Sequence, residues 1–277
     1  MKLRIDLEDT FGDIVGKASR GTRTTVDQLS KLSGIDRSRL GQLLTDKAQP
    51  TDAEAHAVAK ALGLNPEKLA DLGQHRWYPA DFTAPDYLQH QINRPHPSNG
   101  YFLILRDAKV GAFVDPAGQP SSIIEPLKEA NVQLQYILLT HKHLDHTDAL
   151  AQVRKAFPLA RPVIHELEAP EVGASTRDAI AIRDGDRLPF GDSEIAMVYT
   201  PGHTDGSSCF IYKDAIFTGD TLFAGSIGRT NGPHFGYDDH RNNIRAKILS
   251  LPEDTVVLPG HGPPSTVAQE RAHNPFF

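Results

Sequence analysis

The sequence has little cysteine and no long apolar run, and these absences exclude several classes of protein. Its 277 residues include one cysteine, Cys209, so no disulfide can form within the chain. No stretch approaches the roughly 18 consecutive apolar residues that a membrane-spanning helix needs. The first residues, MKLRIDLEDTFGD, lack the apolar segment of a secretory signal and carry acidic side chains early. We therefore expect a cytoplasmic protein that does not enter a membrane.

The chain also lacks an excess of positive charge. Its net charge is −6 at pH 7, which gives no whole-chain indication of nucleic-acid binding. Residues 1–75 hold 11 Lys and Arg against 11 Asp and Glu, so the remainder of the chain carries all of the net charge. The hydrophobic content of 39% and the charged content of 23% are typical of globular proteins. The length allows one large domain or two smaller ones.

Residues 1–75 are predicted to form a small all-α domain. Short helices, each begun by a Thr, Asp or Asn cap, are predicted over residues 26–33, 37–44, 51–63 and 65–73. Leu29 and Leu32 are expected on the inward face of the first of these helices. Two helices joined through a turn that contains glycine, with a third packed across them, is the helix-turn-helix pattern.

Residues 76–98 are interpreted as a proline-rich linker and lead-in, because prolines at this density interrupt regular elements. The aromatic residues Trp77, Phe82 and Tyr87 indicate that this segment packs against another part of the molecule. From residue 99 to 277, strand-like and helix-like stretches alternate. The mixture predicts a layered α/β domain.

The densest group of chemically active side chains is THKHLDHTD, Thr140–Asp148, which follows the apolar run YILL. His141 and His143 are two residues apart and therefore project to the same side of an extended segment. Asp145 and His146 are expected in the loop that follows. Imidazole nitrogens and carboxylate oxygens together suit a divalent metal ion.

Three later residues repeat one arrangement, in which a side chain able to bind metal follows a strand and a glycine. They are His203 in TPGHTDGS, Asp220 in FTGDTLF and His261 in LPGHGPP. The total of seven candidates is too large for one tetrahedral ion and suits two ions that share a bridging ligand. We expect two divalent metal ions, with zinc as the first choice and iron or manganese as alternatives. The remaining histidines, including His165 and His240, are interpreted as surface residues.

The motifs HKHLDH, TPGHTDGSSC, FTGDTLF and PGHGP resemble, in order and spacing, those of the metallo-β-lactamase-fold hydrolases. The chain is most similar to the short glyoxalase II-like (hydroxyacylglutathione hydrolase-like) group, whose members also carry GSIGRT, PGHGP and NPF near the end. The resemblance covers residues 99–277. It implies an αββα sandwich with the site at the sheet edges, here preceded by the small helix-turn-helix domain.

The resemblance also implies roles for the seven candidates. The first ion would be held by three imidazoles, those of His141, His143 and His203. The second ion would be held by Asp145, His146 and His261. Asp220 would bridge the two ions, and Asp145 would orient the bridging hydroxide that attacks a thioester. Aspartate at position 220 is similar to the glyoxalase II-like enzymes, whereas lactamases of the commonest two-zinc type have cysteine there.

The stretch GSIGRTNGPHFGYDDH, Gly225–His240, is the candidate substrate loop. In the glyoxalase II and persulfide dioxygenase groups the basic residue that matches Arg229 lies near the glutathione-binding side of the site. Arg229 would then bind a substrate carboxylate, with Ser226 and Tyr237 as further candidates. A structural Arg229 that holds the loop is the alternative. A persulfide dioxygenase-like enzyme with one iron, and β-lactam cleavage as a side reaction, also stay open.

Residues 22–72 resemble the Cro/repressor-type helix-turn-helix family. Under that resemblance the exposed face of the recognition helix carries four candidates for DNA contact: Arg37, Ser38, Arg39 and Gln42. The neutral charge of the domain argues against DNA, because specific binding depends on phosphate neutralisation. The alternative is a packing or homodimer module that forms part of the active-site wall. A DNA-binding regulator with a hydrolase-fold sensor domain is the corresponding alternative function.

Overall fold

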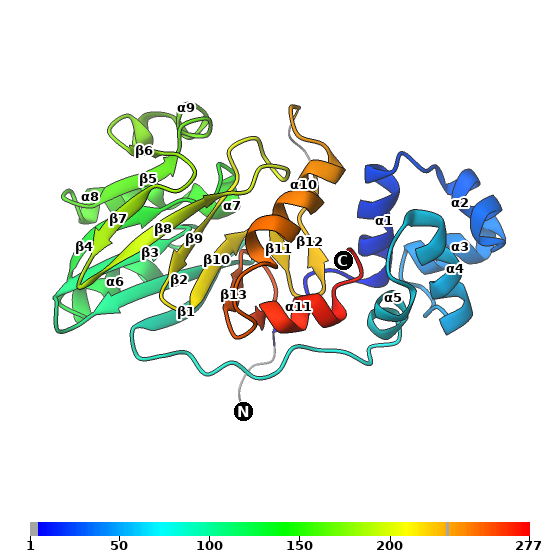
Figure 1. The fold of residues 1–277 in the computed structure, drawn as a ribbon. Coiled ribbons are helices and arrows are strands. Elements are labelled where there is room, and N and C mark those ends of the chain that lie inside the picture. Colours follow the sequence, from blue (N-terminus) through cyan, green and yellow to red (C-terminus); the bar gives the residue numbers. More distant parts are fainter. Residues whose placement is uncertain (1–4, 231–232) are drawn as a thin grey trace.

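The computed structural model describes residues 5–230 and 233–277, and it begins with a helical domain (Figure 1). Its helices are α1 (Phe11–Gly21), α2 (Val26–Ser33), α3 (Arg37–Leu44), α4 (Asp52–Leu62) and α5 (Pro66–Gly73). Capping boxes at Thr10, Thr25 and Thr51 begin α1, α2 and α4, because each threonine accepts from the backbone three residues on. Gly34 and Gly63 end α2 and α4 in left-handed conformations.

The predicted helices are therefore present, but one inward face differs from the prediction. Leu29 is buried, whereas Leu32 is 65% exposed. Three residues turn a helix by about 300°, so Leu32 lies at the margin of the stripe through which α2 contacts α3 and α4.

No helix in the described ranges is long and apolar enough to cross a membrane.

Two six-stranded sheets face each other in the described part of the second domain. The first runs in the spatial order β1 (Leu88–Asn93), β2 (Ser98–Leu105), β3 (Val110–Val114), β4 (Gln133–Leu138), β5 (Arg161–His165) and β6 (Ile180–Ile182). The second runs in the order β14 (Ser265–Thr266), β13 (Val256–Pro259), β10 (Ala215–Gly219), β9 (Ser208–Tyr212), β8 (Ser193–Tyr199) and β7 (Arg187–Phe190). Strand β1 lies within the segment interpreted as linker and lead-in.

Helices cover the outer face of each sheet, which gives the four layers of an αββα sandwich (Figure 1). Helices α6 (Ser121–Glu129) and α8 (Leu150–Ala156) pack on the first sheet. Helices α10 (Tyr237–Asn243), with a π-helical turn over Ile244–Ile248, and α11 (Val267–His273) pack on the second. A separate apolar core fills the space between the two sheets. This architecture is the one expected from the sequence.

The helical domain packs directly on the sandwich rather than hanging from a tether. Buried residues of α1, α4 and α5 share one continuous core with Tyr237, Ile244 and Phe276. Polar contacts reinforce this packing: the ammonium group of Lys17 donates to the carbonyl of Ile227 at 2.7 Å, and that of Lys68 to the carbonyl of Phe277 at 2.8 Å. The contact brings α1 beside the loop that follows β12 (Ser226–Ile227).

Candidate metal centre

The seven candidate metal ligands lie at the ends of four strands, along one edge of the sandwich. His141 and His143 follow β4 of the first sheet. The three others that follow strands lie in the second sheet, after β8, β10 and β13: His203, Asp220 and His261. Asp145 and His146, expected in a loop, lie instead on the one-turn helix α7 (Leu144–Thr147), which His143 precedes in an extended conformation. The turn aims both side chains back toward the strand ends.

The side chains form two groups, within each of which the offered atoms lie within 4.8 Å of one another. In the first group, Nδ1 of His143 lies 3.0 Å from Nε2 of both His141 and His203. In the second group, Nε2 of His261 lies 3.3 Å from Nε2 of His146 and 3.3 Å from Oδ2 of Asp145. Nitrogen and oxygen atoms this close around a common point are the donor sets of divalent metal ions.

Asp220 lies between the two groups, and its two oxygens face different ones. Oδ2 is 3.4 Å from Nε2 of His203 in the first group. Oδ1 is 3.3 Å from Nε2 of His146 and 3.5 Å from Nε2 of His261 in the second. Oδ1 is buried and makes no hydrogen bond of acceptable geometry with any described residue. A buried carboxylate oxygen without a partner is costly, so a cation between these side chains fits the donor set.

Hydrogen bonds from surrounding residues orient the imidazole rings, and the sequence did not indicate these contacts. The buried Asp115 accepts from Nδ1 of His146 at 3.0 Å, and from the backbone N–H and hydroxyl of Thr140 at 2.8 and 2.7 Å. Nδ1 of His203 donates to the carbonyl of Arg229 at 2.8 Å. These bonds leave Nε2 of His146 and of His203 free to face a metal ion.

A carboxylate of the N-terminal segment also reaches the centre. Oε2 of Glu8 lies 3.8 Å from Nδ1 of His261, on the side of the ring away from the other ligands. Nothing in the sequence around Glu8 indicated this contact. Asp115, by contrast, follows a strand adjacent to β4, which was a usable signal. A carboxylate at that position shares the sheet edge with the histidines after β4.

The charges of the two groups set the protonation of the imidazoles. Burial lowers the pKa of His203 to about 4 and lowers the pKa of His141 well below its ordinary value. Burial would also lower the pKa of His146, but the charge of Asp220 and the hydrogen bond to Asp115 raise it well above the usual range. Burial would raise the pKa of Asp220, but the nearby imidazoles hold it well below its ordinary value. Burial thus favours the neutral imidazoles of His141 and His203, and the second group lies among the carboxylates whose negative charge a cation would balance.

Two histidines expected at the surface are buried, so that interpretation is wrong for them. His240 is fully buried beneath Gly202, where a Cβ atom would lie 2.3 Å from Nδ1 of the ring. His165 is 5% exposed and stacks on Tyr199 with ring centroids 4.3 Å apart. For His240 the spacing to Ile244 and Ile248 placed it on the inward side of its helix, which was a readable signal.

The candidate substrate residues separate into two sets. Arg229 and Tyr237 line a cavity of about 300 Å³ between α1 and the loop after β12. Ser226 is buried in β12, where its backbone carbonyl accepts from Asn274, and it does not line this cavity. The main chain at Arg229 touches the His203 ring, so the cavity adjoins the first metal group.

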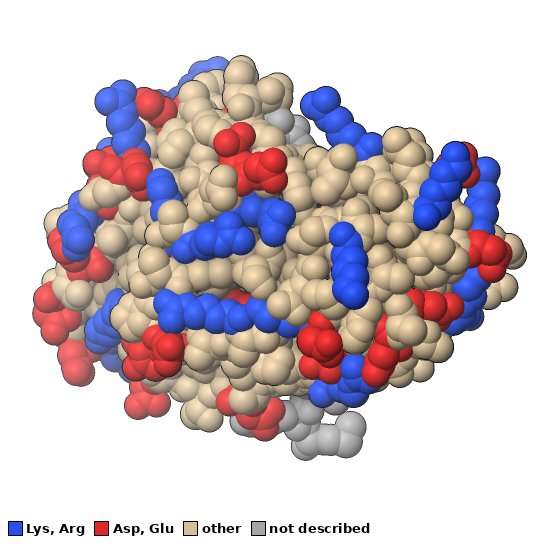
Figure 2. Space-filling model, turned by 45° about the vertical axis from the view of Figure 1, so that its right-hand side comes forward, with Lys and Arg blue, Asp and Glu red and all other residues tan. Residues whose placement is uncertain are grey.

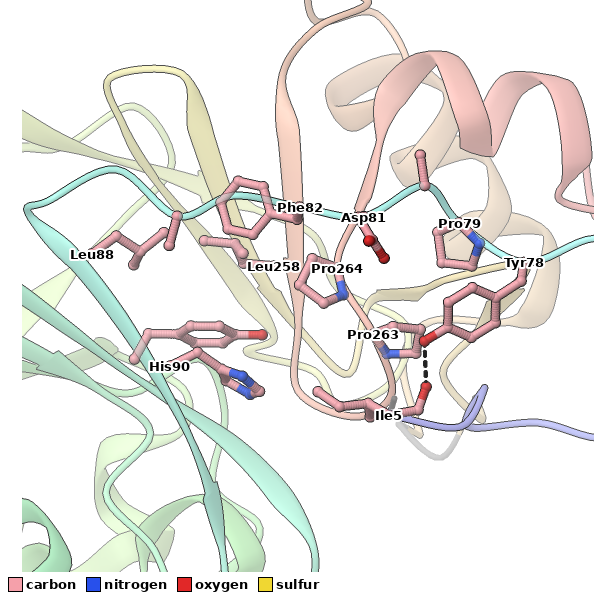
Figure 3. A pocket seen from close by; sticks show the side chains of 13 residues that line it. Ile5, Tyr78, Pro79, Asp81, Phe82, Leu88, His90, Leu258, Pro263 and Pro264 are labelled. Atoms are coloured by element: carbon pink, nitrogen blue, oxygen red, sulfur yellow. Dashed lines mark hydrogen bonds between the residues drawn. The ribbon is translucent and has the colours of Figure 1, made fainter. Parts of the chain in front are cut away.

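A second cavity, of about 550 Å³, lies beside the linker (Figure 3), and none of the seven ligand candidates is among its described lining residues. Phe82, Leu88 and Leu258 form an apolar wall, and the hydroxyl of Tyr78 donates to the carbonyl of Ile5 at 2.5 Å. Trp77 is buried against His273, with stacked rings 5.1 Å apart. The linker is therefore packed along the sandwich, as its aromatic residues indicated.

The four candidates for DNA contact lie on α3 in different environments. Arg37, Ser38 and Gln42 are exposed, but the guanidinium of Arg37 is 2.8 Å from Asp27. Arg39 donates to both carboxylate oxygens of Glu54, at 2.6 and 2.8 Å. On the face drawn in Figure 2, Lys and Arg side chains alternate with Asp and Glu. Both arginines of α3 are thus paired with carboxylates.

Family comparisons divide the chain in the same way as the structure. The model of the metallo-beta-lactamase superfamily matches residues 94–261, and the helix-turn-helix model matches residues 23–69. The chain is 34% identical over 192 residues to hydroxyacylglutathione hydrolase GloC of Haemophilus influenzae, which is 63% of this chain and 91% of that protein.

Two solved structures are similar in fold and sequence. The B3 metallo-beta-lactamase BLEG-1 is 33% identical, with a TM-score of 0.62 over 68% of this chain and 98% of that chain. The protein TTHA1623 in a di-iron-bound form is 28% identical, with a TM-score of 0.56 over 73% of this chain and 100% of that chain.

Proposed function

Because the chain belongs to the metallo-beta-lactamase superfamily, we propose that it is a hydrolase with two divalent metal ions that cleaves a thioester. The observation that carries the proposal is the position of Asp220, whose two oxygens face the two groups of ligand candidates separately. A carboxylate placed in this way suits a bridge between two ions. The similarity to hydroxyacylglutathione hydrolase GloC supports a thioester as substrate.

The ligand roles follow from the two groups. One ion would be held by His141, His143 and His203. The other would be held by Asp145, His146 and His261. Two ions held by these residues would supply activation of a water molecule and polarisation of a substrate carbonyl. Zinc is the first choice for this donor set, and the di-iron form of TTHA1623 makes iron the main alternative.

Side chains of the protein orient the attacking water molecule. Asp145 is about one third exposed, so it can accept a hydrogen bond from the attacking water while it binds an ion. The oxygen of that water would bond to the carbonyl carbon and the carbon–sulfur bond would break, which gives a carboxylate and a thiolate. One proton of the water would pass to the thiolate and the other to solvent. A thiolate leaves readily, so the site needs no strong proton donor. Cys209 is no candidate nucleophile, because burial raises the pKa of its thiol to about 11.

A substrate panel on protein of measured metal content tests this proposal. The panel contains a thioester, a lactone, a β-lactam and a persulfide, each with zinc, iron or manganese loaded. We expect close to two ions per chain and the highest kcat/KM for the thioester. Oxygen consumption with the persulfide and no thioester cleavage would instead support the one-iron dioxygenase. The complete second ligand group favours two ions over one.

Replacement of the bridging carboxylate tests the mechanism directly. Asp220→Ala should lose bound metal and thioesterase activity together, because both groups share this side chain. Asp214→Ala is the matched control, since Asp214 accepts from Tyr87 at a position remote from the centre. An Asp220→Ala protein with normal metal content and full activity would show the two-ion mechanism to be wrong.

DNA binding is the second candidate function, and it rests on the helix-turn-helix match over residues 23–69. The exposed Ser38 and Gln42 leave part of α3 available for contact. A mobility-shift titration at several salt concentrations tests it, with Arg37→Gln and Arg39→Gln as variants. Binding that weakens with salt and with these substitutions would support a DNA-binding regulator. Binding that ignores both would count against it.

A further inference from the structure

A group of basic side chains lines the 300 Å³ cavity between the helical domain and the sandwich. Lys17, Arg20 and Arg23 come from α1 and the turn after it, and Arg229 comes from the loop after β12. No Asp or Glu is among the described residues that line the cavity. In a chain with a net charge of −6, a cavity lined in this way is a local concentration of positive charge.

Three of these four charges lack a partner within the part of the chain that the structure describes. The side chains of Arg20, Arg23 and Arg229 make no hydrogen bond or ion pair with any residue in the described ranges. Lys17 is satisfied, since its ammonium group contacts Asp9 and the carbonyl of Ile227. Arg37 and Arg39 of the same domain are both paired with carboxylates. The unpaired guanidinium groups are therefore a property of this cavity and not of the whole domain.

The same three arginines also line an adjoining hollow of about 570 Å³ between α1 and the start of α2, where Asp13 is the acidic residue among the described lining. They thus stand between two open volumes, each large enough for part of a small ligand. Arg20 lies in the last turn of α1, where a cation also balances the helix dipole. Arg23 and Arg229 lie outside helices, so the dipole does not account for their positions.

The cavity also presents a buried hydroxyl without a partner and adjoins the metal centre. Tyr237 lines it, is 8% exposed, and has a hydroxyl that makes no hydrogen bond within the described ranges. The carbonyl of Arg229 accepts from the ring of His203, so one residue joins the cavity wall to a proposed metal ligand. The thiol part of a thioester held in this cavity would therefore lie next to the first group of ligand candidates.

We propose that the helical domain completes the substrate site, and that Arg20 and Arg23 together with Arg229 bind an anionic group on the thiol part of the thioester. This inference rests on the proposed thioesterase function and names the substrate class for it. Guanidinium groups form strong, paired hydrogen bonds to carboxylates and phosphates. The anion is either the carboxylates of a peptide-like thiol or the phosphates of a nucleotide-linked thiol. The helical domain then serves recognition of the substrate.

Direct binding separates these two sources without any turnover. Isothermal titration of the metal-loaded full chain uses S-hexylglutathione, a thioether that cannot be hydrolysed, and coenzyme A. We expect one of the two to bind, with an affinity that falls as salt rises. The double variant Arg20→Gln, Arg23→Asn should weaken that binding by about tenfold or more. Asparagine is chosen at position 23 because this residue has a φ of 55°, which asparagine tolerates.

Two controls make the result specific. Arg37→Gln removes an arginine of the same domain that does not line the cavity, and it should leave binding unchanged. Unchanged affinity in the double variant, or no binding of either probe by the wild-type protein, would overturn the inference.

Steady-state kinetics then separates this inference from the proposed function. With the thioester of the preferred thiol, the double variant should raise KM and keep kcat, whereas the uncharged acetyl thioester of N-acetylcysteamine should be unaffected. Binding that needs the arginines without any thioester cleavage would refute the thioesterase and leave the anion site. Cleavage with a KM that is independent of the arginines would refute the anion site alone.

Discussion

If the protein binds the two proposed metal ions, the substitution Asp115→Asn should weaken the binding of one and leave the other little changed. Asp115 is 1% exposed and has a φ of 54°, a conformation that asparagine tolerates better than other replacements. The variant therefore keeps the backbone and changes only the hydrogen bonds. The amide oxygen can still accept from the N–H of Thr140, as Oδ1 does at 2.8 Å in the native protein.

The amide nitrogen of the variant would face Nδ1 of His146, which now donates to Oδ2 at 3.0 Å. Two donors cannot share that contact, so the ring is driven to the tautomer with its proton on Nε2. That proton occupies the position of the lone pair that faces Asp220 and His261. Loss of such a supporting bond typically lowers metal affinity by about 10–100-fold.

Metal titration against a chromogenic chelator, with the ion content confirmed by elemental analysis, measures this effect. We expect the second ion to bind about 10–100-fold more weakly and the first ion to change little. Asp148→Asn is the matched control, because Asp148 lies in the same stretch and its carboxylate accepts from the N–H of Gly118, remote from the imidazole rings. If both ions bound Asp115→Asn with native affinity, the role of this contact in presenting His146 would be refuted.

Three further predictions follow from packing, charge and metal binding. Gly21→Ala should destabilise the protein by about 1–3 kcal/mol in chemical denaturation, because its Cβ would lie 2.2 Å from the ring of Tyr237. In the control Gly41→Ala, on α3, the added Cβ would meet no atom within 4 Å, so the variant should be about 0.5–1 kcal/mol more stable than the wild type. Equal changes in stability for the two variants would contradict the docking of the two domains. Burial raises the pKa of Glu270 from 4.5 to about 7, so its contribution to stability is full below pH 4.5 and is lost as the pH rises to about 7. Glu270→Gln should remove that decline, worth roughly 3 kcal/mol, and an unchanged pH profile of unfolding would count against it. Removal of metal with a chelator should lower the melting temperature of the wild type more than that of Asp220→Ala.

The candidate metal ligands could be predicted from the sequence because they lie in short local motifs. His141 and His143 come shortly after a strand, and His203, Asp220 and His261 come after a strand and a glycine, so each motif can be recognised from the sequence alone. The sequence could not predict that the two oxygens of Asp220 face different ligand groups. This arrangement depends on the place of β10 between β13 and β9 in the second sheet.

Other features depended on tertiary contact and were not readable. Strand β1 forms in a proline-rich segment because β2 offers it an edge to pair with. The contact of Glu8 with His261 and the cavity beside Arg229 both arise from the docking of the helical domain. A domain with no net charge gives no sign in its sequence of the surface on which it will pack.

The core that continues from α1, α4 and α5 into the sandwich has a consequence for how the molecule comes apart. Two modules with separate cores can melt one after the other, but modules that share buried side chains such as Ile227 and Phe276 lose them together. We therefore expect the chain to unfold as one cooperative unit. Any molecule that binds one module then stabilises the other, and the coupling acts equally in both directions. The helical domain and the candidate metal centre therefore share one free energy of unfolding.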